Sequence, residues 1–165
     1  MGAVARWGAV LFERRAEVSV SRRRTLEEYR ERAKGLIERR KSKIHGWGVF
    51  ATARIKRSTK IIDYAGEKIP HKESRRREDK YLRKGHIWCF HLNSRWVRDA
   101  GVGGNIARFV NHKCAPNCWV DIEGDNIWIR AARTIRKGEE LSYDYETDGD
   151  KIIPCRCSPG CTRKL

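Results

Sequence analysis

Apolar residues follow a helical spacing in one early segment of the chain. They share one face of a helix drawn over residues 26–39 and are Leu26, Tyr29, Ala33, Leu36 and Ile37. Thr25 precedes this segment and Glu28 stands three positions later, which is the pattern of a capping box. The pattern therefore predicts one helix over residues 26–39.

After residue 44 the apolar positions form short blocks separated by glycine-rich turns. These blocks have strand length and composition and cover residues 46–50, 61–66, 87–92, 119–122 and 127–131. Residues 123–126, Glu-Gly-Asp-Asn, are typical of a hairpin turn between the last two blocks. The charged stretch 73–83 is a short helix or a connection. We expect a mainly β domain over about residues 44–147, followed by a loop-rich tail.

The charge distribution divides the chain. The 165 residues carry a formal net charge of +16, which favours polyanionic partners, although solvated basic faces explain it equally well. Residues 1–45 hold 13 Lys and Arg against 6 Asp and Glu, whereas residues 138–150 hold only acidic charges. The apolar run Trp7–Phe12 is too short to cross a bilayer, so we expect a soluble intracellular protein without membrane association.

Four of the six cysteines, Cys114, Cys155, Cys157 and Cys161, stand late in the chain. Without a secretory signal, such a group indicates metal binding more than a disulfide framework, and the alternative is that these are reduced spare thiols. The segment 108–118 adds Asn111 and His112. Taken alone, this segment could belong to a protease-like site, but the chain lacks the partners that a reactive cysteine needs. The other interpretation is that His112 and Asn111 simply cap a turn.

Five segments in one order resemble the SET-domain lysine methyltransferases. They are His45-Gly-Trp-Gly-Val-Phe50, Asp63-Tyr-Ala-Gly-Glu67, the segment 108–118, Gly138-Glu-Glu-Leu-Ser-Tyr-Asp-Tyr145 and Cys155-Arg-Cys-Ser-Pro-Gly-Cys161. The resemblance covers about residues 43–165 and is nearest to trithorax-like or compact free-standing SET enzymes. It implies a β-clip-like fold of small curved sheets with short helices, a knot-like C-terminal threading and a zinc-bound post-SET loop. The implied division is a basic arm with one helix (1–42), a SET domain (43–148) and a post-SET tail (149–165).

The resemblance also implies site residues. Tyr145 matches the catalytic tyrosine, Tyr143 the position that tunes the number of methyl groups, and Tyr64 a third residue of the lysine channel; ordinary core aromatics are the alternative interpretation. S-adenosylmethionine is the implied methyl donor, and its expected contacts are His45, Gly46, Trp47, Tyr81, Arg108, Asn111, His112 and Arg156. Asn105 and Arg108 are expected to hold the cofactor-binding segment in place.

By the same resemblance, Cys114, Cys155, Cys157 and Cys161 are the four zinc ligands. Two positions depart from the family pattern: three residues instead of four separate Cys157 from Cys161, and Lys113 stands where serine is usual. A tetrahedral zinc ion needs four ligands, which this set supplies.

The sequence thus predicts a protein-lysine N-methyltransferase that acts on a histone or another basic DNA-associated protein, mainly by monomethylation. We expect a monomer that contacts nucleic acid non-specifically through the basic arm. If the source is a eukaryote, we expect the protein on nuclear chromatin. If the source is a bacterium, we expect it in the cytoplasm or exported into a host cell. The alternatives are an inactive SET-like binding module and a zinc-stabilised nucleic-acid-binding protein.

Overall fold

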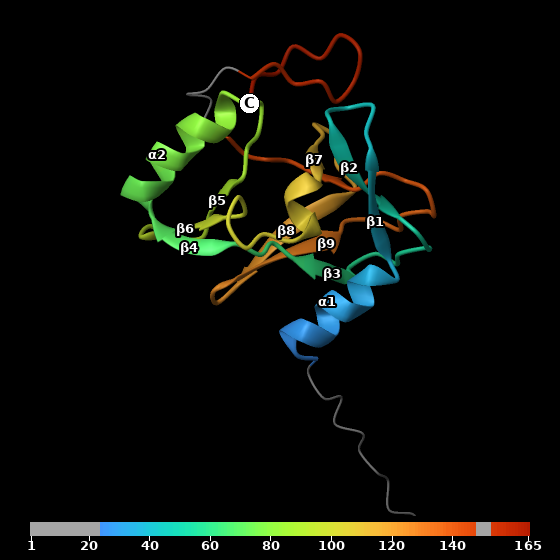
Figure 1. The fold of residues 1–165 in the computed structure, drawn as a ribbon. Coiled ribbons are helices and arrows are strands. Elements are labelled where there is room, and N and C mark those ends of the chain that lie inside the picture. The colour runs from blue at the N-terminus through green and yellow to red at the C-terminus, as the bar shows by residue number, and fades with distance from the viewer. Residues whose placement is uncertain (1–23, 148–152) are drawn as a thin grey trace, which may run out of the picture.

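Four small sheets and two helices make up the described part of the protein (Figure 1), which in the computed structural model comprises residues 24–147 and 153–165. The helices are α1 (Leu26–Lys34) and α2 (His71–Leu82), and a 3-10 turn, η1, covers Ile106–Phe109. The mainly β fold predicted from the sequence is confirmed. Within these residues, no helix is long and apolar enough to span a membrane.

The sheets are short and mostly antiparallel. Strand β1 (Ile37–Lys41) pairs with β2 (Trp47–Ala51), and a three-stranded sheet has the order β3 (Lys60–Asp63), β9 (Asn126–Ala131), β8 (Cys118–Glu123). A second three-stranded sheet has the order β4 (Glu67–Pro70), β6 (Trp96–Asp99), β5 (Cys89–His91). The exception is β10 (Ser142–Tyr143), which runs parallel to β7 (Asn111–His112).

The predicted helix over residues 26–39 was wrong at its C-terminal end. Thr25 and Glu28 form the expected capping box, but the helix stops at Lys34 and Gly35 caps it. From Ile37 the backbone instead pairs with β2, in the register Ile37 opposite Ala51. The apolar side chain of Ile37, only 4% exposed, is therefore buried by a strand and not by a helix face. Tertiary pairing here outweighs helical spacing.

Helix α1 is fixed to the domain by a two-pronged ion pair. Arg30 donates to both carboxylate oxygens of Asp63, at 2.9 and 2.7 Å, and Asp63 is nearly buried. Asn105 donates to the main-chain oxygen of Asp63 at 2.9 Å and accepts from the Ala107 N–H at 3.1 Å, so the same residue holds the turn η1 in place. The end of β3, the helix α1 and the segment leading to β7 are thereby joined.

One apolar core fills the space between the sheets. It draws on residues from every sheet, and its largest fully buried members include Ile55, Ile61, Ile127, Ile129, Ile135 and Leu141. Ile61, Ile127 and Ile129 belong to the short apolar blocks seen in the sequence, whereas Ile55, Ile135 and Leu141 lie outside them. Burial of such side chains at roughly 1.5–3 kcal/mol each is the main stabilising contribution. The charged stretch after residue 73 lies in α2, and residues 124–125 form the predicted hairpin turn.

Candidate active site

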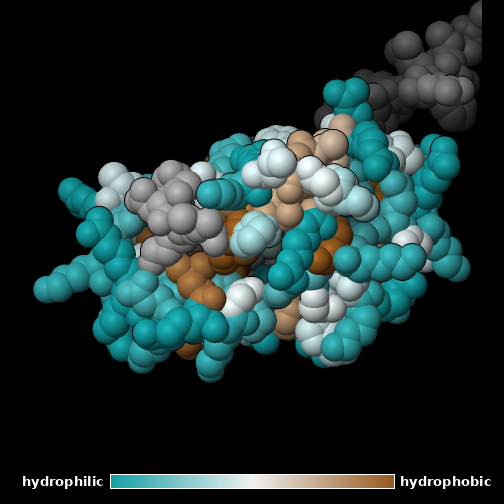
Figure 2. Space-filling view, turned by 90° about the horizontal axis from the view of Figure 1, so that it is seen from above, coloured by the Kyte–Doolittle hydropathy of each residue, from teal (hydrophilic) through white to brown (hydrophobic). Residues whose placement is uncertain are grey.

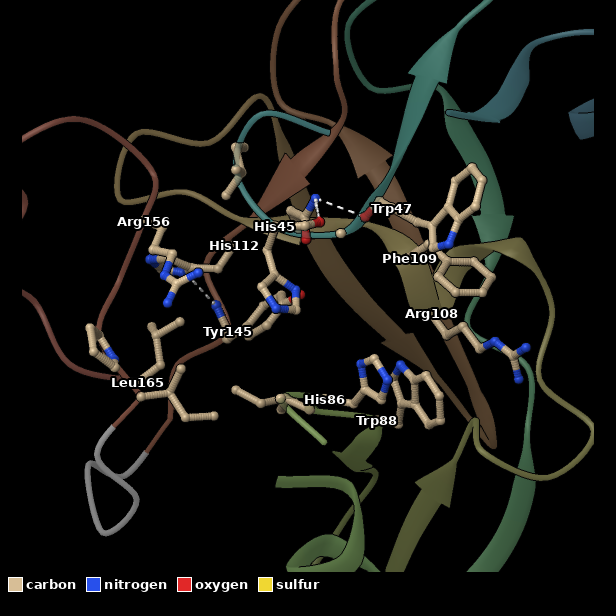
Figure 3. Close-up of a pocket in the computed structure, with 17 residues that line it drawn as sticks. His45, Trp47, His86, Trp88, Arg108, Phe109, His112, Tyr145, Arg156 and Leu165 are labelled. Carbon is tan, nitrogen blue, oxygen red and sulfur yellow. Dashed lines mark hydrogen bonds between the residues drawn. The ribbon is translucent and has the colours of Figure 1, made fainter. Parts of the chain in front are cut away.

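A first pocket of about 220 Å³ lies between β2, the segment 85–88, the segment 108–112 and the C-terminal tail (Figure 3). It brings together seven of the eight residues predicted to contact a cofactor. The lining residues are Ile44, His45, Gly46, Trp47, Gly85, His86, Ile87, Trp88, Arg108, Phe109, Asn111, His112, Tyr145, Ile153, Pro154, Arg156 and Leu165.

The exception is Tyr81, which does not line this pocket. Its ring packs at 5.2 Å from the Trp88 ring, and its hydroxyl donates to the buried carboxylate of Asp99 at 3.0 Å. That acceptor and burial together raise the pKa of Tyr81 to about 12. The structure therefore places Tyr81 as a support for Trp88, one layer behind the pocket wall.

Asn111 ties the first pocket together through its side-chain amide. The amide donates to the main-chain oxygens of Trp47 at 3.0 Å and His45 at 3.4 Å, and to the Glu140 carboxylate at 2.8 Å. Glu140 also accepts from the Ser42 hydroxyl at 2.7 Å. Because this amide is committed to its own chain, its contribution to the pocket is to hold the loop 45–47 in its curved path.

Gly48 is the position that makes this network fit. A Cβ atom there would collide with the carboxylate of Glu140 and touch Ser42. We expect Gly48→Ala to lower the free energy of unfolding by about 1–3 kcal/mol, since overpacking must displace a hydrogen-bonded carboxylate. Thermal unfolding measures the effect. Gly35→Ala is the matched control: Gly35 has a φ of −87° and a Cβ there meets only Arg32 O at 3.7 Å, so an equal loss of stability in this variant would contradict the argument.

His86 and Trp88 form an aromatic wall that the sequence did not reveal. Their rings are stacked at 4.2 Å with an angle of 7°, and the Arg108 guanidinium lies 5.1 Å from the Trp88 ring on this wall. Burial and nearby cations lower the pKa of His86 below its ordinary value, so the imidazole is neutral at physiological pH. Only the cluster of aromatic residues between residues 86 and 90 could have indicated such a wall.

A second pocket, of about 690 Å³, opens between β5, β8 and the segment 143–147. It contains all three predicted catalytic tyrosines and shares Ile87 and Tyr145 with the first pocket. Its lining residues are Tyr64, Glu78, Ile87, Cys89, Phe90, His91, Pro116, Cys118, Trp119, Val120, Ile122, Tyr143, Asp144, Tyr145, Glu146 and Thr147. The two pockets therefore meet at Tyr145.

The three tyrosines form the inner wall of the second pocket. The rings of Tyr143 and Tyr145 lie 4.9 Å apart, Phe90 lies between Tyr64 and Tyr143, and the Tyr64 hydroxyl donates to Trp88 O at 3.1 Å. Burial raises the pKa of Tyr64, Tyr143 and Tyr145 above the ordinary value of a phenol. All three are therefore neutral at physiological pH and can orient a bound group, but they do not act as bases.

The acidic charges after residue 138 do not all face this pocket. Asp144 and Glu146 line it, together with Glu78 from α2, which the sequence did not indicate. Glu139 instead binds Arg133 through both its carboxylate oxygens, and Glu140 lies in the Asn111 network. The rim of the second pocket is thus acidic and its outer wall is apolar, with Trp119 and Ile122 both 45% exposed.

His112 connects the tyrosine wall to the cysteines. Its Nδ1 accepts the main-chain N–H of Tyr145 at 3.2 Å, so the proton of the neutral ring is on Nε2, which lies 3.4 Å from Cys114 Sγ. Burial lowers the pKa of His112 and keeps the ring neutral. The imidazole can then donate to a thiolate at Cys114, which is how outer hydrogen bonds orient metal ligands.

The thiols of Cys114, Cys155, Cys157 and Cys161 form a compact group whose sulfur atoms all lie within 4.8 Å of one another. Cys114 Sγ is 3.9 Å from Cys155 Sγ and 3.8 Å from Cys161 Sγ. Four sulfurs at about 2.3 Å from a tetrahedral zinc ion would be ~3.8 Å apart, so the cluster fits zinc. A main-chain N–H of Cys114 lowers the pKa of Cys157 to about 6, which provides one thiolate at neutral pH without a metal.

The tail 153–165 closes over the first pocket. It folds back on itself through mutual hydrogen bonds between Ile153 and Leu165, at 2.9 and 2.8 Å. Arg163 reaches the body of the domain and binds both carboxylate oxygens of Asp144 at 2.7 and 2.9 Å. Through this closure the tail supplies Arg156 and Leu165 to the pocket wall (Figure 3).

Two pockets meet at one neutral tyrosine, beside a four-thiol cluster that includes three residues of the tail. This arrangement is suited to two ligands whose reacting ends meet at a common point. The sequence profile of the SET domain matches residues 46–146. The chain belongs to the SET domain family.

Similar proteins share the greater part of this chain. A histone-lysine N-methyltransferase, H3 lysine-4 specific, from Emericella nidulans is 42% identical over 132 residues, which are 73% of this chain and 11% of that protein. Histone-lysine N-methyltransferase trr of Drosophila melanogaster is also 42% identical over 132 residues, 74% of this chain and 5% of that protein. Human histone-lysine N-methyltransferase 2D is 38% identical over 132 residues, 75% of this chain and 2% of its own length. The chain thus spans about a tenth or less of the length of these relatives.

Proposed function

We propose that the protein is an S-adenosylmethionine-dependent protein-lysine N-methyltransferase. The observation that carries the proposal is the meeting of the two pockets at Tyr145, with the tyrosine wall on one side and the predicted cofactor contacts on the other. Bound in the first pocket, S-adenosylmethionine would supply an electrophilic methyl group. His45, Trp47, His112 and Arg156 would hold it there, and Asn111 would support the loop 45–47 around it.

The second pocket has the properties needed to present a neutral amine. A lysine ammonium has a pKa of roughly 10.4 and arrives charged. Enclosure between the rings of Tyr64, Phe90 and Tyr143 disfavours the charged form, which promotes proton loss. The Tyr145 hydroxyl donates its proton to Val110 O at 2.8 Å, so its oxygen lone pairs remain available to accept a hydrogen bond from the amine. Orientation of the amine nitrogen lone pair is then the main catalytic contribution of the protein.

A histone is the substrate that best agrees with the site and the relatives. The rim residues Glu78 and Glu146 favour a basic peptide, whereas Asp144 is already paired with Arg163, and the relatives named above are histone-lysine methyltransferases. We therefore propose lysine 4 of histone H3 as the first target to test. Because these relatives come from a fungus, a fly and human, we place the protein on nuclear chromatin and not in a bacterium.

Three further properties remain part of the proposal. We infer that the chain acts as a monomer and divides into an arm (1–42), a SET domain (43–148) and a post-SET tail (149–165). The arm is proposed to contact nucleic acid through its basic side chains. Of its segments, residues 1–23 lie outside the described residues, whereas α1 and β1 pack on the domain.

Tyr143 is proposed to limit the product to monomethyl-lysine. It is 5% exposed, its ring packs on Tyr145 and Phe90, and it lines the second pocket. Removing its hydroxyl makes room for a methylated amine to turn and react again. We expect Tyr143→Phe to shift the product from monomethyl- to di- and trimethyl-lysine with the first methyl transfer slowed less than threefold, as measured by mass spectrometry of a peptide. An unchanged product distribution would contradict this role.

The direct test is transfer of labelled methyl groups from S-adenosylmethionine to core histones and to an H3 peptide that contains lysine 4. An H3 peptide with arginine at position 4 is the control. Labelling of the first peptide alone supports both the activity and the target. Cofactor binding without labelling of any histone or basic protein would favour the inactive binding module, and retention on DNA without cofactor binding would favour the nucleic-acid-binding protein.

A further inference from the structure

Two turns far apart in the sequence lie side by side at one end of the domain. Residues 55–59 and residues 135–139 are joined by reciprocal main-chain hydrogen bonds between Ile55 and Ile135, each 2.9 Å long. Both isoleucine side chains are buried and anchor their turns in the core. In Figure 1 the corresponding green and orange loops meet beyond the ends of β2 and β3.

The two turns have the same construction, offset by 80 positions. Thr59 N–H donates to Lys56 O at 3.2 Å, and Glu139 N–H donates to Arg136 O at 3.1 Å. Each turn has a left-handed residue at its third position, Ser58 with φ 64° and Gly138 with φ 85°, as a type II turn requires. The conformation is held in place at Ser58 although serine rarely adopts it, which shows that the surrounding hydrogen bonds define the turn closely.

Each turn presents two consecutive basic side chains to solvent. Lys56 and Arg57 stand on the first turn and Arg136 and Lys137 on the second, all four exposed. None of these four side chains forms an ion pair with another described residue. The nearest carboxylate on these turns, that of Glu139, is already bound by Arg133 and by the main-chain N–H of Arg136. We call Lys56, Arg57, Arg136 and Lys137 the paired-turn patch.

The chemistry of the patch selects its partner. The large exposed apolar residues of the described chain are Trp47, Val102, Trp119 and Ile122, and none of them belongs to either turn. A protein partner would need an apolar centre in the interface, and single-stranded nucleic acid would need aromatic rings on which bases stack. Fixed cations alone match the phosphates of a nucleic acid duplex, which bind through charge without reading sequence.

The patch is also separate from the catalytic machinery. None of its four residues lines either pocket, and its turns are built on the opposite ends of β2 and β9 from the loop 45–47 and the hairpin 124–125. A duplex bound there leaves both pockets open. Figure 2 shows the molecule from above, where hydrophilic side chains predominate and apolar residues lie mostly in recesses.

We propose that the paired-turn patch is a docking surface for the phosphate backbone of double-stranded nucleic acid. This contact is additional to the one proposed for the basic arm, and it is independent of the methyl-transfer proposal because binding is measured without cofactor. On a chromatin substrate it would hold the domain on DNA while a histone tail occupies the second pocket, a consequence that does rest on the proposed function.

The test measures binding of the full chain to a fluorescent 20-base-pair duplex over a range of salt concentrations. The patch variant replaces Lys56, Arg57, Arg136 and Lys137 by glutamine. The control replaces four exposed basic residues of α2 and its end, Lys72, Arg75, Lys80 and Arg83, so that both variants have the same net charge. Loss of each phosphate contact reduces the magnitude of the slope of log K against log salt by about 0.9. For the patch variant, we therefore expect the slope magnitude to fall by about 2–4 and the affinity for the duplex to fall at least ~10-fold. The control variant should show neither change.

Three results would overturn the proposal. The first is an equal loss of duplex affinity in the patch variant and the control variant, and the second is no loss in either. The third is that the patch variant loses as much affinity for poly-glutamate as for the duplex, which would indicate a general surface for acidic polymers. Unchanged methylation of a free H3 peptide by the patch variant shows that the fold is intact. If methylation is absent in every form of the protein, an unchanged circular dichroism spectrum and thermal midpoint serve the same purpose.

Discussion

Tyr145→Phe is expected to reduce the rate of methyl transfer at least about 100-fold, which corresponds to ~2.7 kcal/mol of transition-state stabilisation. The loss follows from position, because Tyr145 is the aromatic residue common to both pockets and its hydroxyl is held by Val110 O. Without the hydroxyl the amine loses the group that orients it, and the carbonyl of Val110 loses its donor. Single-turnover transfer to a peptide measures the effect on the chemical step.

Binding and stability separate this role from a structural one. The ring remains in the variant, so affinity for S-adenosylmethionine is expected to change less than threefold in calorimetric titration. Tyr29→Phe is the matched control, since Tyr29 packs on Trp128 from α1 and touches neither pocket. Full activity of Tyr145→Phe, or an equal loss in Tyr29→Phe, would remove Tyr145 from the catalytic machinery.

Loss of the metal is expected to open the first pocket. In Cys161→Ser the protein should fall from about one bound zinc per chain to none, because three thiols no longer complete the tetrahedral site. Among the described residues, the tail would keep the Arg163–Asp144 ion pair, the contacts of Cys157 and Arg163 with Cys114, and its own hydrogen bonds. Since Ile153, Pro154, Arg156 and Leu165 all line the pocket, affinity for S-adenosylmethionine should fall at least ~10-fold.

Metal analysis and amide hydrogen exchange test this sequence of events. Exchange in residues 153–165 should accelerate in Cys161→Ser, while exchange in the core strands β3 and β9 stays slow. Cys89→Ser is the control, because Cys89 lies outside the thiol cluster, and this variant should retain its zinc. Zinc retained in Cys161→Ser would refute the ligand set, and slow exchange of the metal-free tail would show that zinc is not what closes it.

The parts of the fold that could be predicted from the sequence are those with a local cause. The capping box of Thr25 and Glu28 and the Gly-Asp turn at residues 124–125 depend on neighbours in the chain, and both are present. Strand β1 was missed because its only buried side chain is Ile37 and its other four are exposed. A strand whose stability comes from its partner β2 has no periodicity of its own to reveal it.

The site shows the same division. The motif residues Asn111, His112 and Tyr145 were identified because they stand in recognisable segments, and all three line the first pocket. His86 and Trp88 stand in no such segment, and both are positioned by Tyr81, whose main-chain oxygen accepts from the His86 N–H and whose ring packs on Trp88. The hydrogen bonds of Asn111 could not be read from the sequence, because its three acceptors come from residues 45, 47 and 140.

The parallel pair β7–β10 has a consequence for how the protein is made. Parallel strands need a long connection, and here the 29 residues between His112 and Ser142 contain β8 and β9. In a growing chain, residues 142–145 are added after β8 and β9, and contacts of this sequence separation form slowly. We therefore expect a ribosome-bound chain that ends before residue 142 to lack Tyr143 and Tyr145, and with them the tyrosine at which the two pockets meet.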